Sequence, residues 1–486
     1  MNRVARTTRR LLVLATARTS GAALALGLFS LPAHAAPRAH SAVDAPPAND
    51  PKVTLAEESS PTEDSGTTAA GENAPTISLA EVLHHAAHDP PTVLAALATL
   101  QRIEAQESYA KAAWIPSLTA QATGGFVYDN RLIFPNTPRI DSKALSVQGN
   151  ATVEWAALSV ERGANIDAAK ANTRAQKFAE HATERAALVA AAELYIRAGA
   201  ATELVKDAEL TVQRRTEENV GISGLAKLGM RPPVDAQRSE VEAVSARYAL
   251  EARRDDALAA YAALAVALGR SPTDPVRPET TTTTVFSVSI HPAEAQRVAM
   301  KNRPEIRSLV ASVVAARESY NAAIGARYPT VGVSTTATVS YSDVLSGLGI
   351  PGYQYGGQAV GYVRWSGLDP SVWQRASVTE AAIAEAQHQL EATVLTVQGE
   401  AVGASYTVNR AKTDRDSAVA VLSLAQVTRE AQDGRYRTGN ASLLDLLDAE
   451  NLEQQARQRR IEAERDYEIA GARLLAACGL LGRFAE

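Results

Sequence analysis

The chain has little of what usually builds a globular core or a redox site. Of its 486 residues one is cysteine, three are methionine and six are phenylalanine, and aromatic residues make up 5%. The single Cys478 excludes an internal disulfide and a cysteine metal cluster, and its place in the apolar run LLAACGLL predicts a packing role. Much of the hydrophobic fraction of 46% is alanine, which suits long, closely packed helices better than a globular enzyme.

Long apolar runs are also scarce. The N-terminus carries four arginines in its first ten residues, then an apolar stretch at residues 21–31, then AHA at 33–35. This order is typical of a secretory signal peptide, which we predict at residues 1–35. Beyond it no run of about 18 apolar residues occurs, so we expect no membrane-spanning helix in the mature chain.

Basic residues are fewer than acidic ones, 49 against 54. The formal net charge is −5, and removal of residues 1–35 takes away five arginines and no acid, which makes it −10. An acidic mature chain argues against a nucleic-acid partner. Residues 36–76 are rich in Ala, Pro, Ser, Thr, Asp and Glu without an apolar period, and we interpret them as a disordered acidic leader.

What the sequence does contain is a tandem duplication. Pro116 and Pro329 lie 213 positions apart, and each ends a helical pattern and opens an alternating one. Farther on the offset is 210, which pairs Gly229 with Gly439. We therefore predict two repeats of helix, hairpin and long helices, joined by an extended connector; their bounds are 77–270, 293–481 and 271–292, respectively.

Alternating segments in each half predict strands. The clearest, TVGVSTTATVSYS at residues 330–342, puts valines and a tyrosine on one parity and mostly Thr and Ser on the other. Such a strand faces an apolar medium on one side and water on the other. The predicted strands cover about 117–128, 145–155, 330–342 and 358–365.

Between the hairpins the sequence predicts very long helices. No proline lies between Pro138 and Pro232, and a helix over about 156–228 would be about 100 Å long. In the second half, apolar residues from 383 to 411 recur at threes and fours, a period of about 3.5 that is typical of coiled coils.

Four strands cannot close a barrel, and an open sheet edge does not occur in lipid. Strands pooled from several copies would form a closed barrel, and aromatic residues gather in and beside these strands, as they do at the interfaces of transmembrane barrels. The expected interface residues are Tyr128, Trp155, Tyr341 and Trp365. A soluble sandwich is the alternative, but the attached helices are too long for one.

This ordered set resembles the TolC-like outer membrane factor family over residues 77–481. It includes the signal peptide, the helix start SLAE at 78–81, the prolines before the strands, and GNASLLDLLDAEN at 439–451. The resemblance implies a mainly α protein with β structure: a homotrimer with a twelve-stranded outer-membrane barrel and a helical tunnel across the periplasm. It also implies docking to a periplasmic adaptor and an inner-membrane pump.

Two tight turns would form the periplasmic tips. Gly229 and Gly439 allow the chain to reverse, and the exposed turns are suited to adaptor contact. The expected contact residues are Gly229, Met230, Arg231, Arg437, Thr438, Gly439 and Asn440.

The resemblance places Asp445 and Asp448 at the pore constriction, where like charges would raise proton affinity and attract cations. Ser442 and Asp445 also read as a capping box, so pore lining and capping both remain open for Asp445. Where a member of the family has an arginine, two residues after the tip glycine, this chain has Ala441.

No catalytic arrangement or phosphate loop is evident, so we predict a non-enzymatic protein without cofactor or metal. His84, His85 and His88 are interpreted as a surface or packing cluster, since no carboxylate or cysteine completes a motif with them. Scattered Asp and Glu residues are interpreted as solvated faces and inter-helix pairs.

The predicted function is a passive exit duct for small molecules such as drugs, in a tripartite efflux system of the outer membrane. A type I protein secretion duct has the same architecture, and a trimeric coiled-coil surface fibre or adhesin is a further alternative.

Overall fold

The computed structural model describes residues 75–131, 140–279, 286, 288–342 and 352–481, which all belong to one compact unit, Ser65–Glu486. The predicted signal peptide and almost all of the predicted leader lie outside the described residues. The leader's last residue, Thr76, is instead part of a short strand, β1 (Thr76–Ile77).

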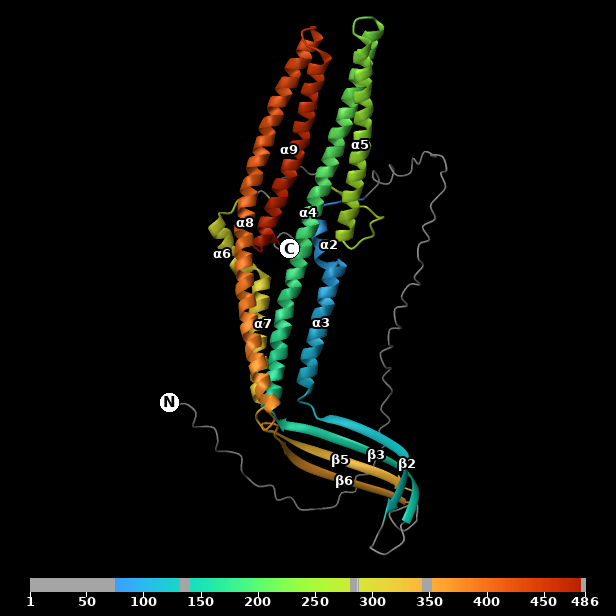
Figure 1. Cartoon of the computed structure of the whole chain (residues 1–486), viewed down its shortest axis with the longest axis vertical. Coiled ribbons are helices and arrows are strands. Elements are labelled where there is room, and N and C mark those ends of the chain that lie inside the picture. Colours follow the sequence, from blue (N-terminus) through green and yellow to red (C-terminus); the bar gives the residue numbers. More distant parts are fainter. Residues whose placement is uncertain (1–74, 132–139, 280–285, 287, 343–351, 482–486) are drawn as a thin grey trace. The chain divides into compact units, whose positions relative to one another are not determined.

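Two similar halves follow each other along the chain (Figure 1). In each half the three longest helices have 22, 68 and 35 residues. The first half has α2 (Leu79–His88), α3 (Pro91–Ala112), α4 (Val160–Lys227) and α5 (Pro233–Ala267), and the second has α6 (Pro292–Asn302), α7 (Pro304–Gly325), α8 (Pro370–Arg437) and α9 (Leu443–Ala477). A 68-residue helix is about 100 Å long.

Local signals set the helix ends. Pro91, Pro233, Pro304 and Pro370 each occupy the first position of a helix, where the missing N–H costs nothing. α2 begins with a complete capping box between Ser78 and Glu81.

The four strands of the hairpins form one antiparallel sheet in the order β2-β3-β5-β6. Their bounds are Ser117–Arg131 (β2), Ile140–Leu158 (β3), Thr330–Ser342 (β5) and Gly352–Arg364 (β6). β6 starts six residues before the predicted 358 because the glycine-rich GYQYGG segment pairs with β5, with Tyr353 opposite Tyr341 and Tyr355 opposite Val339. Cross-strand packing therefore outweighs the turn signal of the glycines.

The helices form two layers, one next to the sheet and one farther from it (Figure 1). Next to the sheet the neighbours are α3, α4, α7 and α8 in that order, and farther away they are α5, α4, α9 and α8. α4 and α8 run through both layers, whereas α3 gives way to α5 and α7 gives way to α9.

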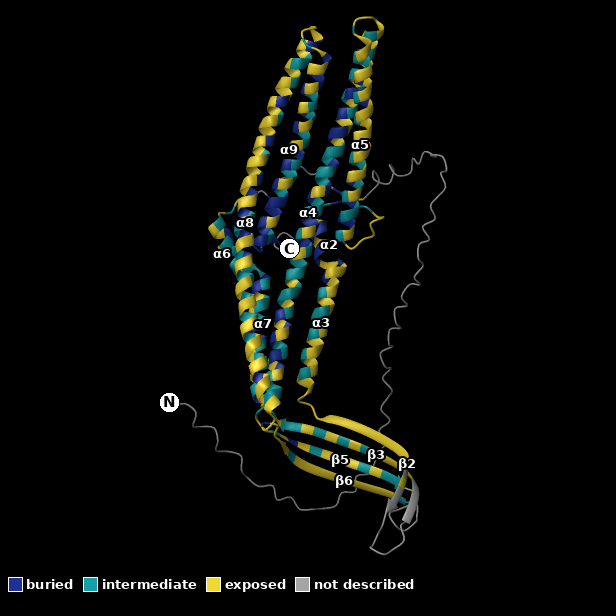
Figure 2. Cartoon of the chain, in the orientation of Figure 1, coloured by how far each residue is buried: buried dark blue, intermediate teal, exposed yellow. Residues whose placement is uncertain are grey.

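Buried residues concentrate where the layers meet (Figure 2). One core cluster combines α2, α4 and α5 with Phe286 of the connector, and a second combines α6, α8 and α9 with Cys478, which is fully buried as a packing residue. The predicted connector contains β4 (Arg277–Pro278), which pairs in parallel with β1. The connector is thus joined to the first described segment of the chain.

Candidate functional site

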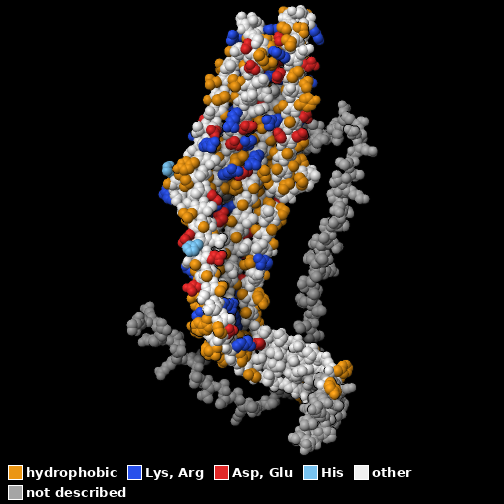
Figure 3. Space-filling model, in the orientation of Figure 1, with side chains coloured by type: hydrophobic (Ala, Val, Ile, Leu, Met, Phe, Trp, Pro, Cys, Tyr) orange, Lys and Arg blue, Asp and Glu red, His pale blue; other side chains and the backbone are white. Residues whose placement is uncertain are grey.

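The sheet has one apolar and one polar face. Pairing places Val147 opposite Tyr341, and Trp155 opposite Val333, on one face. On the other face the Thr152 and Thr336 hydroxyls lie 3.2 Å apart. In Figure 3 the visible sheet surface is mostly white, which marks backbone and uncharged polar side chains, while charged side chains gather on the helices. Such two-sidedness matches strands between lipid and water.

The polar face carries a contact that spans three strands. Tyr362 of β6 lies over Gly332 of β5 and donates a hydrogen bond from its hydroxyl to Oε1 of Glu154 on β3, at 2.8 Å. Arg364 Nη2 is 3.4 Å from the same Glu154 oxygen. The ring therefore lies along the sheet rather than projecting from it.

Tryptophans mark the end of the sheet that joins the helices. Trp155 Nε1 donates to the Trp114 carbonyl at 3.1 Å, and in the second half Trp365 Nε1 donates to the Arg327 carbonyl at 2.9 Å. The predicted interface residues Trp155, Trp365 and Tyr128 are 41%, 56% and 61% exposed. Toward the other end Tyr341 packs on Tyr353, with ring centroids 4.9 Å apart. Aromatic side chains thus lie at both ends of the strands.

The opposite ends of the long helices are the two predicted turns. Gly229 and Gly439 have φ values of 73° and 79°, the left-handed conformation that glycine adopts without strain. Met230 beside Gly229 is 68% exposed, and Thr438, Gly439 and Asn440 are exposed as well. The residues predicted to contact an adaptor thus lie in the turns, and most are accessible.

Arg231 and Arg437 have different partners. Arg231 crosses from the first turn to α8, where its Nη2 donates to the Tyr436 carbonyl at 3.1 Å and its guanidinium lies 4.1 Å from the centroid of the Tyr436 ring. Arg437 is paired with Asp433 one helical turn earlier in α8, at 2.9 Å. Of the two, Arg231 is the one that links the two halves.

The structure gives Asp445 the capping role. Ser442 and Asp445 form a complete capping box at the start of α9, and hydrogen bonds from Ser442 lower the pKa of Asp445. Asp448 is also exposed, one turn farther along, and belongs to no cap. A pore role for these two carboxylates remains a prediction.

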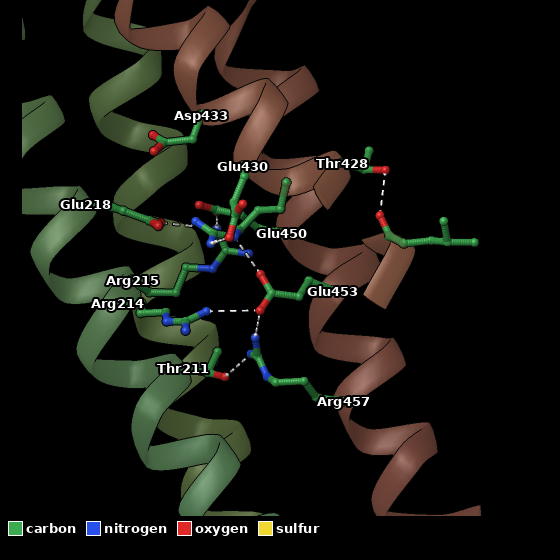
Figure 4. A network of polar contacts seen from close by, with 12 residues as sticks. Thr211, Arg214, Arg215, Glu218, Thr428, Glu430, Asp433, Glu450, Glu453 and Arg457 are labelled. Carbon is green, nitrogen blue, oxygen red and sulfur yellow. Dashed lines mark hydrogen bonds and ion pairs between the residues drawn. The ribbon is translucent and has the colours of Figure 1, made fainter. Parts of the chain in front are cut away.

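A buried charge cluster lies below the turns, between α4, α8 and α9 (Figure 4). Its centre is Glu453 of α9, whose side chain is 4% exposed and accepts contacts from arginines of all three helices. The N–O distances to Arg457, Arg429 and Arg214 are 2.6, 2.7 and 3.4 Å, respectively. We call this set, with Asp207, Arg215, Glu218 and Glu450, the charge clamp.

The charge clamp continues on both sides of Glu453. Arg457 Nε is 2.6 Å from Asp207 of α4, and Arg215 is in contact with both Glu218 and Glu450. A cavity of about 520 Å³ opens beside it, lined by charged side chains of the three helices and by Tyr436. From the sequence we interpret these carboxylates as solvated faces and inter-helix pairs. They do form inter-helix pairs here, but Asp207 and Glu453 are buried rather than solvated.

The histidine interpretation needs one correction. A carboxylate does accompany the three histidines, because Asp89 lies 2.6 Å from His85 Nδ1. His84 and His88 stack with ring centroids 5.1 Å apart, and His88 Nδ1 is bonded to the His84 carbonyl. Within the described ranges, the residues that bring His, Cys, Asp or Glu ligand atoms within 4.8 Å of one another are Glu180, His181 and Glu184.

In the described part of the chain, no helix combines the length and apolar character needed to span a membrane. Residues 296–480 match the family model described as "Outer membrane efflux protein". A search of curated proteins gives no match.

Solved structures share the fold at low identity. A membrane protein from Pseudomonas aeruginosa matches with a TM-score of 0.70 and 19% identity, covering 82% of this chain and 92% of that one. The Campylobacter jejuni CmeC outer membrane channel has a TM-score of 0.66 and 16% identity, with coverages of 82% and 85%. The open state of the Neisseria gonorrhoeae MtrE outer membrane channel has a TM-score of 0.63 and 18% identity, covering 83% of this chain and 89% of that one.

These matches confirm the predicted fold class: mostly helical, with four antiparallel strands in the arrangement of outer membrane channels. The family match over the second half agrees with the fold of the whole described chain. Residues 296–480 are therefore similar to the outer membrane efflux protein family, and the described chain shares its fold with solved outer membrane channels.

Proposed function

We propose that three copies of the chain assemble into one exit duct, with a twelve-stranded barrel in the outer membrane and a helical tunnel in the periplasm. The observation that carries this proposal is that the sheet and both helix layers have the same open edges. One side ends in β2, α3 and α5, and the other ends in β6 and α8. A neighbouring copy can therefore continue all three layers at once.

The open helix edges are apolar. α8 exposes Leu395, Tyr406 and Leu424 at 68%, 63% and 68%, while α5 exposes Val241 and Tyr248 at 62% and 75%. Sustained exposure of large apolar side chains marks a surface that a partner covers. β2 and β6, each paired on one side within the described sheet, would find their missing partners across the same joint.

Barrel size favours three copies over two. An eight-stranded barrel has an interior that side chains fill, whereas larger barrels enclose a water-filled channel. Three copies with four strands each pool twelve strands. The polar face would then line the channel and the apolar face would contact lipid.

The tip is the proposed gate. The turns at Gly229 and Gly439 would meet a periplasmic adaptor, and separation of α8 and α9 from α4 and α5 would widen the end of the tunnel. Asp448 would line the closed constriction with its copies. MtrE has been solved in an open state, which supports a gated channel for this fold.

The proposed cargo is small molecules, delivered by an inner-membrane pump through the adaptor. The efflux description of the matching family favours this over protein secretion. Energy would come from the pump.

Purification of the mature protein in detergent tests the proposal. We expect a particle with three times the mass of one chain and single-channel conductance in planar bilayers. A monomer that needs no detergent would contradict it, and a trimer that never conducts would favour the fibre alternative.

A further inference from the structure

Two carboxylates of the charge clamp face one buried arginine. Arg215 of α4 has a side chain that is 5% exposed and contacts Glu450 of α9, while its Nη1 lies 3.3 Å from Glu218 of α4. Its Nη2 also donates to Oδ1 of Asn451 at 2.9 Å. Glu450 is 13% exposed, and its carboxylate and that of Glu218 both face the Arg215 guanidinium. A hydrogen bond between the two carboxyl groups requires that one of them carries a proton.

The groups around Glu450 come from three helices (Figure 4). α4 contributes Arg214, Arg215 and Glu218, with Glu217 at the cavity wall. The set from α8 is Arg429, Asp433 and Arg437, and that from α9 is Glu453 and Arg457. Because Arg214, Arg429 and Arg457 are engaged by Glu453, Arg215 is the direct partner left for the Glu218 and Glu450 pair.

We propose that Glu218 and Glu450 share a proton that holds α4 to α9 in the closed channel, and that loss of this proton favours opening of the tip. The inference rests on the proposed tip gate and adds its regulation by protons. With both carboxylates ionised, two negative charges would face one arginine in a half-buried site, and the resulting repulsion is relieved when the helices separate and water enters.

The protonation equilibrium supports this assignment. Burial, together with the hydrogen bond and negative charge of Glu218, raises the pKa of Glu450 from 4.5 to about 8. In an open tip Glu450 is hydrated and its pKa returns toward 4.5. The closed state therefore binds a proton that the open state releases.

The sign of the pH effect follows from linkage. The advantage of the closed state is complete below a pH of 4.5 and is lost as the pH rises through about 8. Within this window the ratio of open to closed channel rises by up to about tenfold per pH unit for each protomer.

The test is the open probability of the full-length trimer in planar bilayers, recorded from a pH of about 5 to about 9. We expect the open probability of the unaltered protein to rise with pH. Glu450→Gln keeps the shape and hydrogen bonding but cannot ionise, so the pH dependence should disappear and the channel should stay mostly closed.

Glu218→Gln gives a second, different readout. It removes the neighbouring negative charge, so Glu450 loses its proton more easily beside Arg215, and the rise in open probability should shift to lower pH. This variant keeps the proposal testable even if Glu450→Gln assembles poorly.

Two controls keep Glu218 and Glu450 intact. Glu430→Gln makes the same charge change beside Arg429 at a side chain that is 70% exposed. Glu468→Gln alters a carboxylate of α9 whose pKa burial raises to about 7, but which lies five helical turns from Glu450. Both should retain the pH dependence of the unaltered protein.

The outcomes separate the two proposals. A trimer that never conducts contradicts the duct itself. A conducting channel whose pH dependence is absent, survives in Glu450→Gln, or is not shifted by Glu218→Gln overturns the proton-sharing inference and leaves the duct intact.

Discussion

Arg231, in the turn between α4 and α5, lies over the ring of Tyr436 at the end of α8, with 4.1 Å between the guanidinium carbon and the ring centroid. Its Nη2 also donates to the Tyr436 carbonyl at 3.1 Å. Tyr436 is 8% exposed, and burial raises the pKa of its hydroxyl. One side chain thus joins the tips of the two halves.

Arg231→Ala should weaken the contact between the tips of the two halves by about 1–2 kcal/mol, because it removes one cation–π contact and one hydrogen bond. We expect a higher open probability in planar bilayers with unchanged conductance of the open channel. Arg437→Ala is the matched control, because Arg437 is 76% exposed and paired with Asp433 of its own helix. An equal rise in open probability in both variants would exclude a specific role of Arg231 in gating.

Glu453→Gln should be among the most damaging single changes in the helical part. It removes, at a side chain that is only 4% exposed, the counter-charge that Arg214, Arg429 and Arg457 share, at a cost of about 3–5 kcal/mol. We expect a lower midpoint of thermal unfolding and easier proteolysis near the tips. Glu464→Gln alters a carboxylate paired with Arg460 of the same helix, and it should cost less than about 1 kcal/mol.

Much of the fold follows from signals with a fixed period. The two-residue alternation at 330–342 coincides with β5, and the offset of 210 places Gly229 and Gly439 at matching turns. These signals are local or repeat along the chain, so one sequence suffices to read them. The order β2-β3-β5-β6 was not predicted, since it depends on which strand of one half meets the other.

The charge clamp shows why the site was harder to predict. Arg214, Arg215 and Glu218 look like an ordinary solvated helix face, and so do Glu450 and Glu453. Burial arises only when α9 packs on α4 across 235 positions of sequence, as in the Arg215 contact with Glu450. The arginine and glutamate spacing on both helices was the available signal, but it does not reveal which faces meet.

Asp448→Ala tests the predicted constriction. If copies of Asp448 form a ring of carboxylates in the closed pore, they attract divalent cations, and their removal should weaken block of the conductance from the periplasmic side by about tenfold or more. Asp414→Ala is the control, because Asp414 is paired with Arg410 along α8, away from the turns. Unchanged block in Asp448→Ala would remove this residue from the pore lining.

Gly332→Ala tests the contact that keeps Tyr362 along the sheet. An added Cβ would lie 2.6 Å from the Tyr362 ring and 2.7 Å from the Trp155 carbonyl, so the ring must move away from Glu154. We expect a smaller yield of assembled trimer and a reduced conductance as the ring projects into the channel. At Gly361 of β6 an added Cβ meets nothing within 4 Å, and Gly361→Ala should leave both quantities unchanged.

Gly471 of α9 tests whether the connector is held against the helices. Its position corresponds to Tyr261 in the first half, at the offset of 210, and Tyr261 fills its site and bonds Thr202 at 2.7 Å. In the second half the backbone of Phe286 occupies that space, and a Cβ on Gly471 would lie 2.0 Å from the Phe286 carbonyl oxygen. The glycine therefore makes room for the connector.

Gly471→Ala should displace the connector and lower the stability by about 1–3 kcal/mol, the usual cost of overpacking. Gly403→Ala is the matched control on α8, where an added Cβ meets nothing within 4 Å and better helix propensity should raise the stability by up to about 1 kcal/mol. Thermal unfolding of the two variants should thus shift in opposite directions. A shift of the same sign in both would show that the connector does not depend on close approach at Gly471.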